Sequence, residues 1–71
     1  MFKDELYDEV KYFVKTDKFN STSAVMMIAS VQRRYRIGFI RALDILKSLL
    51  DDGIITEKSI DKIYEYHMLT R

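Results

Sequence analysis

The sequence predicts a mainly α-helical fold with a small β element, in which a three-helix core contains a helix-turn-helix. Apolar residues recur at helical spacing in the first fifteen residues and again over residues 39–50. A glycine-bearing break separates residues 39–50 from an earlier apolar run, which is the pattern of a helix-turn-helix. The β-branched pair Ile54-Ile55 then suits a short strand. Because 71 residues suffice for one domain, we expect residues 1–71 to form a single unit.

The composition excludes several classes of protein. The chain has no cysteine and one histidine, His67, so it offers neither a disulfide framework nor a cysteine or paired-histidine metal site. We therefore expect no metal and no cofactor. No catalytic nucleophile lies beside a base in any recognisable pattern, so we expect neither an enzyme nor a small-molecule substrate. No apolar run approaches the ~18 residues of a membrane span, which predicts a soluble cytoplasmic protein without membrane contact.

The first segment predicts an amphipathic helix over residues 2–15. Spacings of three and four place one apolar set on a single face: Phe2, Leu6, Val10 and Phe13 or Val14. Acidic residues come first and lysines follow, which complements the helix dipole at both ends. The turn and capping residues over 16–23 end this helix.

Residues 24–35 have two interpretations. Residues 25–28 suit a short buried strand, with a helix starting near Ala29 or Ser30. Alternatively the whole run from Ser23 to Tyr35 is one helix, capped by a hydroxyl residue among 21–23. Its inward face would then be Val25, Ile28, Val31 and Tyr35.

The clearest helix spans residues 39–50. Its inward stripe is Phe39, Ala42, Leu43, Leu46, Leu49 and Leu50, and its outward face is Arg41, Asp44, Lys47, Ser48 and Asp51. Gly38 before the helix suits a positive φ or a close approach between helices. Gly53 is a natural terminator at the other end.

The tail after Ile55 also has two interpretations. Ile60, Ile63 and Tyr64 fit a helix that begins near Thr56 or Ser59. An alternation over residues 64–68 fits a strand instead, which makes residues 57–62 the tip of a hairpin. That tip contains no glycine, proline or asparagine, so turn chemistry favours the helix.

Charge is concentrated in the middle of the chain. The formal net charge is only +1, but residues 21–50 carry five basic residues and one acidic residue. Four of the basic residues are Arg33, Arg34, Arg36 and Arg41. A basic segment that coincides with a helix-turn-helix indicates nucleic-acid binding, whereas an ordinary solvated charge cluster is the alternative.

The run from Val31 to Thr56, VQRRYRIGFIRALDILKSLLDDGIIT, resembles the gamma domain at the C-terminus of FtsK/SpoIIIE-type DNA translocases. DELYDEVKYFV, from Asp4 to Val14, resembles the start of that domain. The resemblance implies a winged helix-turn-helix that binds short G-rich orienting sequences in double-stranded DNA and contacts a tyrosine recombinase. It matches Gly38 to the turn between the helices and Gly53-Ile54-Ile55 to the first wing strand.

The resemblance assigns the DNA-facing pattern to Gln32, Arg33, Arg34, Arg36 and Arg41. Two positions depart from the family, because Ile40 stands where the family has asparagine and Asp44 where it has arginine. Neither residue can make the base contacts of those it replaces, so we expect altered specificity. The glycine-rich wing tip and the ATPase phosphate loop are absent, which makes the chain a free-standing gamma-like domain if Met1 is a natural start.

The expected roles divide by element. Arg33, Arg34 and Arg36 contact phosphates. Arg41 reaches a base edge from a recognition helix in the major groove, and Lys47 follows the DNA backbone. Ile40 either touches a thymine methyl group or lies partly buried, and Asp44 repels phosphate or accepts from a cytosine amino group. The alternative function is a protein-interaction module that binds a recombinase, a translocase or another partner without reading DNA.

Overall fold

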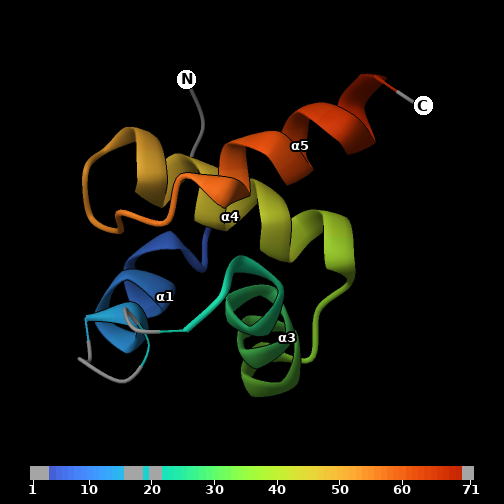
Figure 1. Cartoon of the computed structure of the whole chain (residues 1–71). Coiled ribbons are helices and arrows are strands. Elements are labelled where there is room, and N and C mark those ends of the chain that lie inside the picture. Colours follow the sequence, from blue (N-terminus) through green and yellow to red (C-terminus); the bar gives the residue numbers. More distant parts are fainter. Residues whose placement is uncertain (1–3, 16–18, 20–21, 70–71) are drawn as a thin grey trace.

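The computed structural model describes residues 4–15, 19 and 22–69, and it shows a small helical fold arranged around one central helix (Figure 1). The helices are α1 (Tyr7–Val14), α3 (Ala24–Tyr35), α4 (Phe39–Asp51) and α5 (Ser59–Leu69). Helix α4 lies between α5 on one side and the pair α1 and α3 on the other, and it contacts all three (Figure 1). The prediction of a mainly α fold is therefore confirmed.

The core is entirely apolar, and no polar side chain is buried among the described residues. Its fully or nearly fully buried members are Tyr7, Val10, Val14, Phe19, Ala24, Met27, Ile28, Val31, Ala42, Leu43, Ile45, Leu46, Leu49, Ile55 and Ile60. Five of these belong to α4, which explains why that helix was the clearest in the sequence. Ile45 is buried although the predicted stripe omitted it, whereas Phe39 and Leu50 are only half-buried.

Helix α1 begins later than predicted, at Tyr7, because a turn precedes it. The carbonyl of Asp4 accepts a hydrogen bond from the backbone N–H of Tyr7 at 2.8 Å. Tyr7 is buried, and its hydroxyl donates to the carboxylate of Asp52 at the end of α4. Phe2 lies outside the described residues, while Val10 and Val14 are buried as predicted.

Helix α3 is continuous, so the strand interpretation of residues 25–28 is wrong. Ser23 caps the helix, since its Oγ accepts a hydrogen bond from the backbone N–H of Met26 at 3.3 Å. Val25 was predicted to face inward but is 66% exposed, and Met27 is buried in its place. The physical reason is rotation: burying Ala24, Met27, Ile28 and Val31 turns residue 25 outward.

An aromatic cluster closes the seam between α1 and α3. The ring of Phe13 meets the rings of Phe19 and Tyr35 edge-on, at centroid distances of 5.6 and 6.0 Å. The Tyr35 hydroxyl donates to the backbone carbonyl of Glu9 at 3.0 Å. These contacts fix the end of α3 against α1.

The predicted β element is wrong, because no strand occurs among residues 4–15, 19 and 22–69. Gly53 does end α4 as predicted, with φ of +77° and with the N–H groups of Gly53 and Ile54 bonded to the carbonyls of Leu50 and Leu49. Ile54-Ile55 is then a connection rather than a first wing strand. Helix α5 follows and buries Ile60 in the core, so the helix interpretation of the tail is confirmed and the hairpin interpretation is wrong.

Candidate nucleic-acid interface

The connection from α3 to α4 consists of residues 36–38, a short turn compatible with the predicted helix-turn-helix. The residue in the left-handed region is Arg36, with φ of 53° and ψ of 49°, so the positive φ expected at Gly38 is wrong. The N–H of Arg36 and that of Ile37 both bond to the carbonyl of Gln32, the second at 3.3 Å. Gly38 is extended at the start of α4, and a Cβ there would meet nothing within 4 Å. No close helix approach therefore requires this glycine.

Arg33 and Arg36 lie exposed at the C-terminal end of α3. Within the part of the chain that the structure describes, neither forms an ion pair or a side-chain hydrogen bond. Cations at a helix C-terminus interact favourably with its dipole. Both guanidinium groups therefore remain available to an anionic partner.

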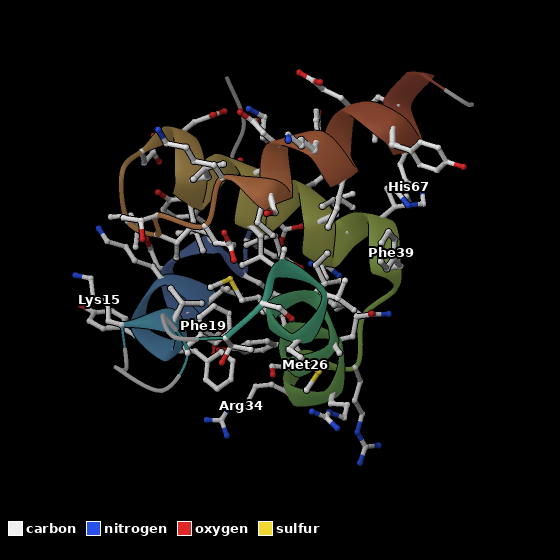
Figure 2. The ribbon with its side chains drawn as sticks, in the orientation of Figure 1. Lys15, Phe19, Met26, Arg34, Phe39 and His67 are labelled. Carbon is white, nitrogen blue, oxygen red and sulfur yellow. The ribbon has the colours of Figure 1, made fainter. Side chains whose placement is uncertain are left out.

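Arg34 is also exposed, but an aromatic ring positions it. Its guanidinium carbon lies 5.5 Å from the centroid of the Phe13 ring on α1. Stacking uses the flat face of a guanidinium and leaves its N–H edges open. Figure 2 shows Arg34 projecting from the α3 side of the molecule.

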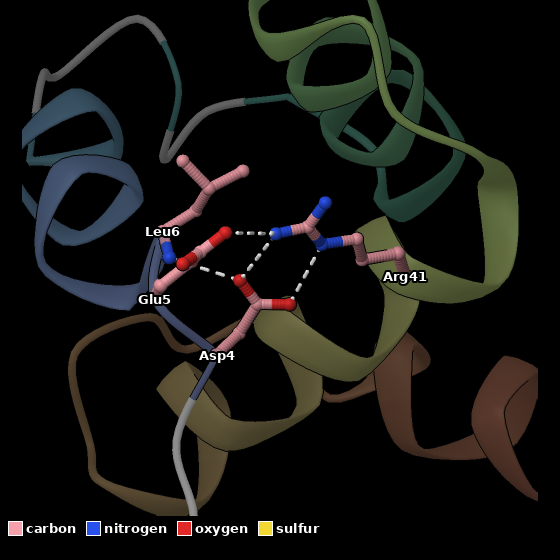
Figure 3. A network of polar contacts seen from close by, with 4 residues as sticks. All are labelled: Asp4, Glu5, Leu6 and Arg41. Carbon is pink, nitrogen blue, oxygen red and sulfur yellow. Dashed lines mark hydrogen bonds and ion pairs between the residues drawn. The ribbon is translucent and has the colours of Figure 1, made fainter.

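Arg41, the predicted base-contacting residue, forms hydrogen bonds and ion pairs with acidic side chains of the protein itself (Figure 3). Its Nε donates to Oδ2 of Asp4 at 2.8 Å and its Nη2 donates to Oδ1 at 3.0 Å. Oε1 of Glu5 lies 3.7 Å from the same Nη2. The hydrogen bond with Arg41 lowers the pKa of Asp4, and the same bond raises the pKa of Arg41.

Lys47, the other cation of α4, also forms ion pairs with carboxylates of the protein. Its Nζ lies 2.8 Å from Asp51, one turn later on α4, and 2.5 Å from Asp61 on α5. It also lies 5.7 Å from the ring centroid of Tyr64. The hydrogen bonds that Lys47 donates to Asp51, the larger cause, and to Asp61 raise the pKa of Lys47, so the ammonium stays charged and paired with α5.

The outward face of α4 between these two cations carries no basic side chain. Asp44 is exposed and forms no ion pair with any described residue. Ile40 and Ser48 on the same face are half-buried. Helix α5 covers another side of α4. There the centroid of the His67 ring on α5 lies 4.8 Å from that of the Phe39 ring on α4 (Figure 2).

The structure thus divides the basic residues of the predicted site into two groups. Arg33, Arg34 and Arg36 gather at the end of α3 beside the half-buried Gln32, and we call these three the α3 arginine cluster. Arg41 and Lys47 lie at the two edges of α4, each facing carboxylates from a neighbouring element.

The partners Asp4 and Asp61 were not predicted from the sequence. Lys47 and Asp51 are four residues apart on one helix, a spacing that signals their ion pair. Asp4 is 37 residues from Arg41, and no local pattern signals a contact over that separation.

A comparison with protein-family models matches the Ftsk gamma domain to residues 2–64. The chain belongs to the FtsK gamma domain family. This match confirms over most of the chain the resemblance noted in the sequence. FtsK gamma domains are DNA-binding domains. No curated protein and no solved structure matches the chain.

Two further findings concern metal binding and membrane-spanning helices. Among the described residues, no group of three or more histidine, cysteine or acidic side chains is arranged to hold a metal ion. No helix in that part of this FtsK gamma domain is long and apolar enough to cross a membrane.

Proposed function

We propose that residues 1–71 act as one domain that binds double-stranded DNA through the α3 arginine cluster, with Arg33, Arg34 and Arg36 contacting phosphates. One observation carries this proposal: these three arginines are the exposed cations of the helix-turn-helix that no described carboxylate engages. Phosphate contacts set the position of a protein on duplex DNA without reading its sequence.

In this proposal α4 faces the major groove with a specificity different from that of the family. Ile40 and Asp44 lie on the part of α4 that would meet base edges. An aspartate there repels phosphates and accepts only from amino groups such as that of cytosine. Specificity from this helix should therefore be weak, and affinity should come mainly from the α3 arginine cluster.

The test is the salt dependence of binding to a labelled duplex of mixed sequence. Each phosphate neutralised contributes about 0.9 to the slope of log affinity against log salt, so three arginines predict a slope of roughly −3. The double variant Arg33→Ser/Arg36→Ser should weaken binding and bring the slope to roughly −1. Lys58→Ser/Lys62→Ser is the matched control, because both lysines are exposed and it removes the same charge away from the cluster.

A second candidate function is protein interaction. Val25 and Met26 are 66% and 48% exposed on α3, the helix that ends in the arginine cluster. Exposed apolar side chains on the same helix as arginines favour a protein partner over DNA. Gel filtration with a candidate recombinase or translocase tests this function, and absence of any duplex shift at ~50 mM salt would favour it.

A further inference from the structure

The carboxylate of Asp4 occupies one of the two edges of the Arg41 guanidinium that could contact DNA. Nε and Nη2 form one side of the guanidinium fork, and both donate to Asp4, at 2.8 and 3.0 Å (Figure 3). A phosphate or the O6 and N7 atoms of guanine would present the same pair of acceptors to such a fork. One edge cannot serve the carboxylate and the DNA at once.

Asp4 is held in place for this contact. Its Oδ1 also accepts the backbone N–H of Leu6 at 2.9 Å, and its carbonyl accepts that of Tyr7 at 2.8 Å. Tyr7 is buried, so this turn is anchored to the core. Asp4 is therefore pre-organised, and its pairing with Arg41 requires little further ordering.

The two acidic residues near Arg41, Asp4 and Glu5, differ in how firmly their side chains are held. The side chain of Asp4 is 23% exposed, whereas that of Glu5 is 88% exposed and approaches Arg41 no closer than 3.7 Å. Asp44 adds a third carboxylate one helical turn after Arg41. A phosphate approaching the Nε and Nη2 edge of Arg41 would thus have to displace Asp4 while repelled by Glu5 and Asp44.

We propose that Asp4 is a specificity-determining residue that competes with DNA for Arg41 and so keeps α4 from contacting phosphates. The proposal rests on DNA binding through the α3 arginine cluster and adds a built-in competitor to it. Non-specific duplexes are bound by the cluster alone. Arg41 joins only where DNA supplies acceptors that replace both oxygens of Asp4.

A double-mutant cycle tests this competition. Wild type, Asp4→Asn, Arg41→Ala and the double variant are titrated with a duplex of mixed sequence over a salt series. Asp4→Asn should bind roughly tenfold more tightly at ~50 mM salt, with a slope steeper by about 0.9, because one more phosphate is neutralised. Arg41→Ala should bind like wild type, and the double variant should match Arg41→Ala.

Asp8→Asn is the matched control, since Asp8 is an exposed acid of α1 and the change in net charge is equal. The competition is refuted if Asp4→Asn gains no more than Asp8→Asn, if the gain persists without Arg41, or if Asp4→Asn binds more weakly. If instead neither wild type nor Asp4→Asn binds any duplex, the proposed DNA-binding function itself fails.

A measurement on the wild-type protein does not depend on how the variants fold. The Nε–H resonances of the arginines are followed by NMR as the mixed duplex is added. Those of Arg33 and Arg36 should shift from the first additions while that of Arg41 stays in place. A shift of Arg41 together with the cluster would overturn the proposal.

Discussion

Arg41 of α4 donates two hydrogen bonds, of 2.8 and 3.0 Å, to the carboxylate of Asp4, which lies 37 residues away in the chain. The pair fastens the segment before α1 to the helix at the centre of the fold (Figure 3). It also pairs one of the two cations of α4 with a carboxylate although Arg41 stays exposed, and Lys47 is paired in the same way with Asp51 and Asp61. The helix expected to contact base edges is thereby the less basic part of the helix-turn-helix.

The first prediction concerns pH. The pKa of Asp4 is lowered from its ordinary 3.8, chiefly by the hydrogen bond with Arg41, so folding favours the ionised form. The contribution is present above pH 3.8 and is lost as the pH falls through the lowered value. The free energy of unfolding of wild type should exceed that of Asp4→Asn at about pH 7 and converge with it near pH 2.

Urea titrations of both proteins at several pH values measure this difference. A difference that stays constant down to the lowest pH would show that the Asp4 carboxylate does not gain stability from its charge.

The second prediction concerns Arg36. A non-glycine residue in the left-handed region costs about 1–2 kcal/mol, and glycine returns part of that through its freedom in the unfolded chain. Arg36→Gly should therefore raise the free energy of unfolding by roughly 0.5–1 kcal/mol, measured by urea denaturation. Gly53→Ala is the converse control, since φ is +77° there, and it should be destabilising by about 1 kcal/mol. Loss of stability in Arg36→Gly would contradict the left-handed assignment.

The third prediction concerns the start of α4. Gly38 is the N-cap, its backbone is extended, and no side chain caps the helix. Because a Cβ there meets nothing within 4 Å, Gly38→Ser should add a capping oxygen without a clash. Thermal unfolding should show a gain of about 0.5–1 kcal/mol. A destabilised variant would mean that the turn needs glycine after all.

The fourth prediction concerns the tail. Ile60 is fully buried, so removing one methyl group by Ile60→Val should cost about 0.5–1.5 kcal/mol. Val25→Ala removes more apolar volume at an exposed position and should change stability by no more than about 0.5 kcal/mol. Equal effects of the two variants in urea denaturation would argue against a packed α5.

Local patterns predicted the helices where hydrophobic spacing was strong. Residues 39–50 were assigned correctly to within one residue, and Gly53 ends the helix through the backbone bonds expected of a terminator. The second helix was ambiguous, because a short apolar run fits a strand or a helix equally well. In the structure this run is a helix packed against α4, and the packing places Met27 rather than Val25 in the core.

The predicted wing is wrong, and the partners of two predicted site residues were not predicted, for reasons that local sequence does not contain. The family resemblance suggested a strand at Ile54-Ile55. In the structure these residues form a connection to α5, and Ile55 and Ile60 are both buried in the core. The charge pattern correctly located basic residues in the middle of the chain, yet it did not show which of them have partners. Those partners, Asp4 and Asp61, come from elements far away in sequence.

The most direct test of the DNA-binding account is backbone amide mapping with a mixed-sequence duplex at low salt. Duplex should perturb the amides of residues 32–38, where the α3 arginine cluster lies, more than those of the exposed residues of α5. Perturbations concentrated on α5 or on the acidic face of α1, or none at ~50 mM salt where electrostatic binding is strongest, would contradict it.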